Sequence, residues 1–392
     1  MNDFVFYNAD RVYFGKNQMS NLTEEVLKFG EKVLLVYGGG SIKKSGLYDL
    51  VTKSLKDSGI EWLEVAGVEP NPRHSTVNKG AAICKKEGID VILAVGGGSV
   101  IDCSKGIAAA ALTEDGDVWP LVSQGTWVKE ALPVIAVLTN AATGSEMDAW
   151  AVISNMDTNE KIGLGGDALV PKAAFENPEY SFSLPEYQTA CGAFDIFNHV
   201  LDNYYLAGES TFDLVLEFQE AVMRSVVKWA PIAMREPDNY EARANLMWAS
   251  SMALNGVLDG GTVHGCACHM MEHELSAYYD ITHGHGLAIV TPRWLTYILD
   301  ETTAPAIYRM GIKVFGVDET MSVMDGAKKA IEAVSEFCFK TLRLKSTLTE
   351  LEIDEEHFRE MAEHACSGMG GVITGPKVLD VEDVEKIYKM CL

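Results

Sequence analysis

In Lys32-Val-Leu-Leu-Val-Tyr-Gly-Gly-Gly-Ser41 a continuous apolar run ends in a glycine turn, and this pattern indicates the class of fold. The pattern returns at Asp90-Val-Ile-Leu-Ala-Val-Gly-Gly-Gly-Ser99. Further strands are expected over residues 61–66 and 133–139, and helices over 22–29, 45–58, 75–86 and 100–112. Apolar strands that alternate with helices are typical of a parallel sheet covered on both faces. The N-terminal part is therefore predicted to be an α/β domain.

The character of the sequence changes after Pro185. Long amphipathic helical patterns follow, for example over 212–234 and 240–254, with few strand signals. We expect residues 1–180 to form the α/β domain and residues 181–392 to form an all-helical domain. Within the first domain, the aromatic and β-branched residues 4–14 predict a strand pair, and residues 150–176 contain short strand-like pieces.

Composition excludes several classes of protein. The chain has 392 residues and a formal net charge of -24, which argues against nucleic acid and anionic membranes as partners. Eight dispersed cysteines without a Cys-x-x-Cys pair indicate reduced thiols. The first residues do not resemble a signal peptide, and we expect a cytoplasmic protein.

The two Gly-Gly-Gly-Ser turns indicate a bound nucleotide. Ligands of open α/β sheets lie at the carboxyl ends of the strands, where glycines let the backbone approach a phosphate. Neither turn completes the pattern Gly-x-Gly-x-x-Gly, because Lys43 and Ile101 occupy the position of the last glycine. A tight turn that binds no ligand is a fair explanation for one such loop, but it is a poor explanation for two loops at corresponding places.

A histidine cluster predicts a metal site in the helical part. Residues 264–285 hold five of the nine histidines. His269 and His273 are four residues apart and share a helix face, as do Asp195 and His199. Imidazoles with one carboxylate suit Fe(II) or Zn(II) better than Ca or Mg. Spacing alone would pair His269 with His273 as ligands. Hydrogen-bonded core histidines are the simpler alternative, and Cys266 and Cys268 are interpreted as small buried residues.

Several motifs together make the chain similar to the iron-containing alcohol dehydrogenase family, most closely to its butanol dehydrogenase branch. They lie at residues 11–16, 35–44, 68–73, 96–105 and 142–147, and at the metal motifs. The resemblance implies a dehydroquinate synthase-like architecture, with a dinucleotide domain and a helical metal domain. It also implies a metal held by Asp195, His199, His269 and His283. His273 is then left beside the metal, where it suits proton relay or substrate contact.

The resemblance also implies which residues line a nicotinamide nucleotide. They lie in the loops after the strands and on one later strand: Gly38, Gly39, Gly40, Ser41, Asn71, Gly97, Gly98, Ser99, Asp102, Thr139, Thr143 and Lys161. Residues 37–44 contain no acid to accept hydrogen bonds from a ribose, but they contain Lys43 and Lys44. This pattern favours NADPH over NADH, although both lysines also suit an ordinary solvated helix start.

The expected activity is the interconversion of primary alcohols and aldehydes such as butanol and butanal, with Fe(II), or alternatively Zn(II), acting as a Lewis acid. A homodimer is expected from the aromatic N-terminal segment and from the resemblance. A polyol oxidoreductase of the glycerol dehydrogenase type, a lyase of the dehydroquinate synthase type and a non-catalytic metal-binding protein remain as alternatives.

Overall fold

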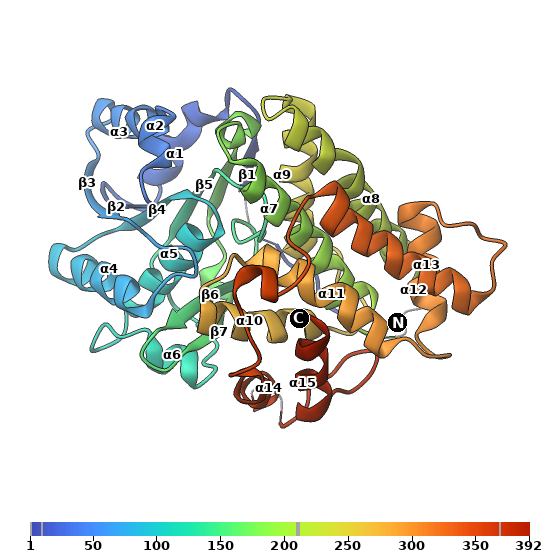
Figure 1. Cartoon of the computed structure of the whole chain (residues 1–392). Coiled ribbons are helices and arrows are strands. Elements are labelled where there is room, and N and C mark those ends of the chain that lie inside the picture. The colour runs from blue at the N-terminus through green and yellow to red at the C-terminus, as the bar shows by residue number, and fades with distance from the viewer. Residues whose placement is uncertain (1, 9–10, 209–211, 368–369) are drawn as a thin grey trace. The chain divides into compact units, whose positions relative to one another are not determined.

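The computed structural model describes residues 2–8, 11–208, 212–367 and 370–392. Its chain divides into two compact units, Tyr7–Leu184 and Pro185–Leu392, and the N-terminal segment ending at Phe6 belongs to the second. The first unit carries a sheet and the second is built of helices (Figure 1). The predicted α/β class with a helical C-terminal part is confirmed.

The first unit is organised around a six-stranded sheet in the order β1-β8-β5-β4-β2-β3, in which every neighbouring pair is parallel. Residues of β4 and β5 are buried throughout, as their continuous apolar sequences predict. The strands are β1 (Arg11–Phe14), β2 (Lys32–Tyr37), β3 (Glu61–Ala66), β4 (Val91–Gly96), β5 (Val134–Leu138) and β8 (Ala173–Glu176).

Helices and one hairpin complete this unit. The helix expected over residues 45–58 corresponds to α3, which begins after Gly46, whose φ is 81°, and an additional one-turn helix, α2, precedes this glycine. The helices are α1 (Leu22–Leu27), α2 (Ser41–Lys44), α3 (Leu47–Asp57), α4 (His74–Glu87), α5 (Gly98–Ala110) and α6 (Trp119–Ser123). The antiparallel hairpin consists of β6 (Trp150–Asn155) and β7 (Glu160–Gly165).

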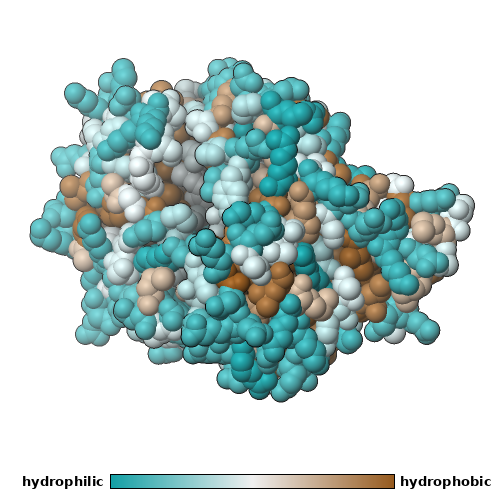
Figure 2. Space-filling model, viewed as in Figure 1, coloured by the Kyte–Doolittle hydropathy of each residue, from teal (hydrophilic) through white to brown (hydrophobic). Residues whose placement is uncertain are grey.

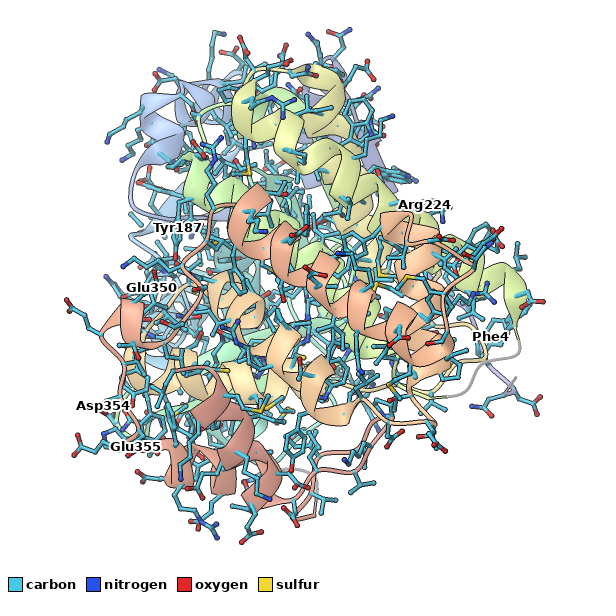
Figure 3. All side chains as sticks on the ribbon, turned by 45° about the vertical axis from the view of Figure 1, so that its right-hand side comes forward. Phe4, Tyr187, Arg224, Glu350, Asp354 and Glu355 are labelled. Carbon is cyan, nitrogen blue, oxygen red and sulfur yellow. The ribbon has the colours of Figure 1, made fainter. Side chains whose placement is uncertain are left out.

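The strand pair predicted over residues 4–14 is wrong. Only Arg11–Phe14 forms a strand, and it pairs with β8 at the edge of the sheet; residues 9 and 10 lie outside the described residues. The preceding segment packs on the helical unit instead. The Asn2 backbone N–H donates to the Gly261 carbonyl at 3.0 Å, and the Phe4 ring (labelled in Figure 3) lies 6.3 Å from that of Phe212. A backbone hydrogen bond and a ring contact, not sheet pairing, hold this segment, whose side chains stay largely exposed.

The second unit has nine principal helices among its described residues. They are α7 (Glu186–Val200), α8 (Asp213–Arg235), α9 (Tyr240–Leu254), α10 (Ala267–Tyr279), α11 (His283–Ile298), α12 (Ala304–Met310), α13 (Val323–Glu336), α14 (Phe358–Ser367) and α15 (Val381–Met390). A π-helical turn, Leu201–Tyr205, continues α7. Helix α10 ends at Tyr279, the next residue, Asp280, has a φ of 51°, and α11 begins at His283. This tight turn brings the first residue of α11 back beside α10.

Hydrophilic side chains predominate on the face drawn in Figure 2, where hydrophobic ones form separate patches. None of the helices in the described ranges is long and apolar enough to cross a membrane. All eight cysteines are free thiols.

Candidate metal centre and nucleotide loops

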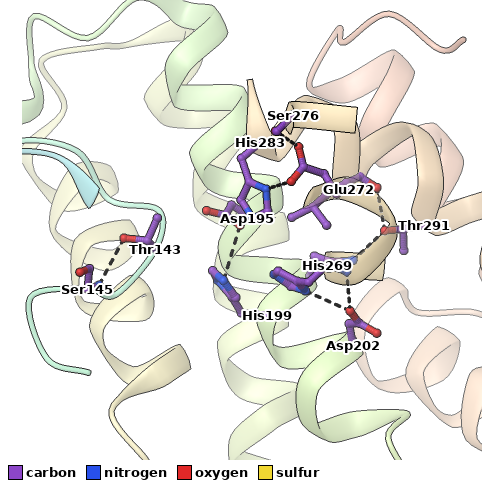
Figure 4. A network of polar contacts seen from close by, with 12 residues as sticks. Thr143, Ser145, Asp195, His199, Asp202, His269, Glu272, Ser276, His283 and Thr291 are labelled. Carbon is purple, nitrogen blue, oxygen red and sulfur yellow. Dashed lines mark hydrogen bonds and ion pairs between the residues drawn. The ribbon is translucent and has the colours of Figure 1, made fainter. Parts of the chain in front are cut away.

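Asp195, His199, His269 and His283 form one group in the helical unit (Figure 4). Helix α7 supplies the first two, one turn apart, and α10 and α11 supply one histidine each. One potential ligand atom from each residue lies within 4.8 Å of the others. The Asp195 Oδ1 atom is 3.7 Å from His199 Nε2 and 3.6 Å from His283 Nε2, which is too long for a hydrogen bond.

The donor set and its spacing fit a divalent ion. Ligand atoms about 2.1 Å from an ion in tetrahedral arrangement are about 3.4 Å apart, close to the distances observed here. Among the described residues, buried His269 Nε2 finds no hydrogen-bond partner. Burial, and then the neighbouring His269 and His283, hold the pKa of His199 well below its usual value. His199 is therefore a neutral imidazole, as a metal ligand must be.

Two further carboxylates hold the rings of this group. Asp202 Oδ2 accepts hydrogen bonds from His269 Nδ1 at 3.0 Å and from the His269 backbone N–H at 3.1 Å. Glu272 Oε2 accepts one from His283 Nδ1. Glu272 was not identified from the sequence. Its signal was an acid three residues after His269, hence on the same helical face.

His273 belongs to a different group, with Glu272 and His283. Its ring lies 5.6 Å from that of His283. Spacing alone paired His269 with His273 as ligands, but the fold places His273 outside the four-residue group. Residues four apart on a helix share a face, but the turn between α10 and α11 inserts His283 beside His269 instead.

The remaining histidines and cysteines of this stretch lie outside the four-residue group. His285 is buried, with Nδ1 3.0 Å from the Tyr187 hydroxyl and Nε2 3.1 Å from the Lys345 carbonyl. His264 is largely exposed and pairs with Asp259. Burial raises the pKa of Cys266 to about 12 and that of Cys268 well above its usual value, so neither is a thiolate near neutral pH.

The glycine turns of the first unit lie side by side. Strands β2, β4 and β5 are neighbours and parallel, so the loops beginning at Gly38, Gly97 and Thr139 emerge at one edge of the sheet. Gly97 precedes α5, and Gly98 and Ser99 form its first turn. A Cβ atom on Gly98 would lie 2.3 Å from Thr143 Oγ1. The absence of a side chain lets these two loops touch.

Other expected nucleotide residues have structural partners of their own. Asp102 Oδ1 accepts a hydrogen bond from Ser145 Oγ at 2.6 Å, and Oδ2 accepts one from the Val152 N–H at 3.0 Å. Burial raises the pKa of Asp102 to about 6. Lys161 lies on β7 and is buried, in register with Ser154.

Two further residues expected to line the nucleotide differ in solvent exposure: Asn71 is buried, whereas Ser41 is exposed. Asn71 is buried with a φ of 52°, and the Pro72 carbonyl next to it accepts a hydrogen bond from the Ser154 N–H. Asn71 thus lies near the hairpin that carries Lys161. Ser41 begins the one-turn helix α2 and is exposed, and a Cβ atom added to Gly39 or Gly40 would have no atom of the described residues within 4 Å.

Residues 37–44 contain no acid, but the neighbouring strand β3 brings a carboxylate beside them. Glu64 on β3 accepts hydrogen bonds of 2.5 Å from the hydroxyls of Tyr37 and Tyr48. The Lys43 ammonium lies 5.0 and 4.6 Å from the centres of the same two rings. The charge of Lys43 is thus held beside an acid that only the sheet pairing brings there.

Comparison with known proteins finds relatives along the whole chain. Residues 9–178 match the family model described as iron-containing alcohol dehydrogenase, and residues 189–392 match the Fe-containing alcohol dehydrogenase family, C-terminal. The chain is 46% identical over 389 residues, 99% of either chain, to NADH-dependent butanol dehydrogenase A of Clostridium acetobutylicum.

Two further comparisons extend this picture. The NADPH-dependent aldehyde reductase of Escherichia coli is 35% identical over 378 residues, which are 94% of this chain and 95% of the relative. The crystal structure of NADH-dependent butanol dehydrogenase A from Thermotoga maritima superposes with a TM-score of 0.94 at 40% identity, covering 100% of this chain and 99% of that one.

Proposed function

Because the chain belongs to the iron-containing alcohol dehydrogenase family, we propose that it interconverts short aliphatic primary alcohols and aldehydes, such as butanol and butanal, by hydride transfer with a nicotinamide cofactor. The observation that carries the proposal is the group of Asp195, His199, His269 and His283. The names of the relatives, butanol dehydrogenases and an aldehyde reductase, support the substrate class.

Asp195, His199, His269 and His283 would hold one divalent ion, and Fe(II) is favoured by the family. When bound, such an ion acts as a Lewis acid toward an alcohol or aldehyde oxygen. The chain contributes neutral imidazoles, one carboxylate and a largely buried setting, with the side chain of Asp195 only 4% exposed. Zn(II) suits the same donors, and metal availability decides between such ions.

His273 would carry the proton that leaves the alcohol oxygen on oxidation and returns to that oxygen on reduction. It is partly exposed, so one side of its ring can exchange protons with water. Imidazole is the side chain whose ordinary pKa lies nearest neutrality, which suits it to this task. In the oxidation direction His273 would accept the proton of the alcohol, and in reduction it would return one.

The α/β unit would bind the nucleotide at the loops after β2, β4 and β5. Contrary to the expectation from residues 37–44, we propose that NADH is preferred over NADPH. Glu64 supports this, because its carboxylate lies with Lys43 and Tyr37 beside the first glycine loop and would repel a 2'-phosphate nearby. Four relatives at 41–46% identity are named NADH-dependent.

Nicotinamide absorbance measured with butanal tests both proposals. Protein stripped of metal and reloaded anaerobically with Fe(II) or Zn(II) is assayed with NADH and with NADPH. We expect turnover only after reloading, and a higher kcat/KM with NADH. Glycerol with NAD⁺ serves as the comparison substrate. Faster turnover of glycerol would favour a polyol oxidoreductase, and stoichiometric metal binding without any turnover would leave a metal-binding protein. A higher kcat/KM with NADPH would restore the expectation from the sequence.

A homodimer in the cytoplasm completes the proposal. Val5 and Tyr7 are 93% and 81% exposed, and β1 lies at the edge of its sheet, so apolar surface and backbone hydrogen-bonding groups are available to a second copy. The eight free thiols support a reducing compartment. Light scattering on the purified protein should give twice the chain mass of 42.8 kDa; a single-chain mass would contradict the dimer.

A further inference from the structure

We propose that Glu272 is a positioning residue that fixes His283 for the metal and thereby sets how tightly this chain holds its ion. The inference rests on the proposed function, since it concerns the same metal site. It assigns a role to a residue that would not itself contact the ion.

His283 is the member of the group that most needs such support. Its side chain is 21% exposed, whereas those of Asp195, His199 and His269 are 4%, 7% and 9% exposed. It is also the first residue of α11, directly after the turn that follows Asp280. Packing therefore restrains this ring less than the others, and a hydrogen bond must supply the restraint.

Glu272 is built into the fold in a way that leaves it little freedom. It has no exposed surface. One carboxylate oxygen accepts from His283 Nδ1, and the other accepts from Ser276 Oγ at 2.5 Å. The Ser276 hydroxyl also lies 3.2 Å from the Ile281 carbonyl in the turn. A Cβ atom on Gly286 would lie 2.7 Å from Glu272 Cγ, so only glycine makes room for this side chain.

The hydrogen bond determines which nitrogen of His283 faces the group. An ionised carboxylate can only accept, so the proton resides on Nδ1 and the lone pair of Nε2 is left for the ion. Nε2 is the atom that lies 3.6 Å from Asp195 Oδ1. Carboxylates that hold metal-bound histidines in this way usually change metal affinity about 10- to 100-fold.

The alternative role for Glu272 is that of a ligand, since it also forms a group with His273 and His283. A ligand role would place a second ion there. The two roles differ in the number of ions bound and in whether the effect of Glu272 depends on His283.

Competition of Co²⁺ between the apo-protein and a chromogenic chelator tests the inference. We expect Glu272→Gln to bind one Co²⁺ about 10- to 100-fold more weakly than the unaltered chain, with little change in the thermal midpoint of the apo-protein. Glu274→Gln is the matched control, because Glu274 is another buried acid on the same helix but belongs to neither group. It should leave the Co²⁺ affinity unaltered.

A double-mutant cycle shows whether Glu272 acts through His283. In a His283→Ala background, Glu272→Gln should cost no further affinity. If Glu272→Gln fails to fold, Ser276→Ala, which removes the hydrogen bond to the other carboxylate oxygen, should weaken Co²⁺ binding in the same direction.

Each remaining result overturns one claim. Unchanged affinity in Glu272→Gln overturns the inference, and so does a fall from two bound ions to one, which would make Glu272 a ligand. Failure of the unaltered chain to bind Co²⁺ at all would instead overturn the proposed metal site.

Discussion

Asp202 and His269 are joined twice, because one carboxylate oxygen accepts both the ring Nδ1–H at 3.0 Å and the backbone N–H at 3.1 Å. His269 is in the first turn of α10, and the residue at the N-cap, Cys266, makes no side-chain cap. A residue from the π-helical turn after α7 therefore caps α10 and orients a histidine of the metal group with the same atom.

Replacement of Asp202 should lower stability even without metal. Asp202→Ala leaves the buried His269 N–H without its acceptor, and we expect a loss of about 1–3 kcal/mol in the free energy of unfolding of the apo-protein. Asp202→Asn is the control, since its amide oxygen can still accept both bonds, although without the negative charge, and should lose less. Urea unfolding measures both, and equal stability of Asp202→Ala and the unaltered chain would contradict this role.

The apo-protein should become less stable below pH 6.5 through His199. The folded pKa of this imidazole is depressed by burial, while the unfolded one stays near 6.5. The unfolded state therefore binds the proton first, and stability present above pH 6.5 is lost as the pH falls, by up to about 1.4 kcal/mol per pH unit. Urea unfolding at pH 7.5, 6.5 and 5.5 should show a shallower loss in His199→Gln. Parallel curves for the two chains would rule out this linkage.

Gly98→Ala and Gly39→Ala form a matched pair in the two glycine loops. A Cβ atom on Gly98 would clash with Thr143, so we expect overpacking to cost about 1–3 kcal/mol. Gly39 has no atom within 4 Å of an added Cβ, so its replacement should leave stability unchanged. If Gly39→Ala keeps its stability but has a raised KM for the nicotinamide cofactor, the added methyl group obstructs the bound nucleotide, which must therefore lie close to Gly39. Thermal melting and cofactor titration distinguish the two effects, and equal melting of both variants would contradict the Gly98–Thr143 contact.

Lys105 should be needed to hold the hairpin β6–β7. It is fully buried, and its ammonium donates to Asp148 Oδ1 at 2.8 Å and to the carbonyls of Asp148 and Trp150. Lys105→Met leaves the Asp148 charge buried without its partner, which should cost about 3–5 kcal/mol. The double variant Lys105→Met with Asp148→Asn removes both charges and should recover part of the loss. No recovery would show that the backbone contacts matter more than the charge pair.

The class of fold and the types of donor could be predicted from the residues alone. Apolar runs that end in glycine predicted the parallel strands, because a strand buried on both faces must be apolar along its length. The spacing of Asp195 and His199 put both on one helical face, because that spacing is local to a single helix.

Which of these residues contact one another depends on how the chain folds between them. The turn after Asp280 puts His283, not His273, beside His269, and the pairing of β2 with β3 brings Glu64 to Lys43. The N-terminal segment, although it has the composition of a strand, contacts Phe212 and Gly261 of the helical unit, more than two hundred residues later in the chain. Contacts of this kind depend on the path of the backbone between distant segments, and no local pattern of residues encodes that path.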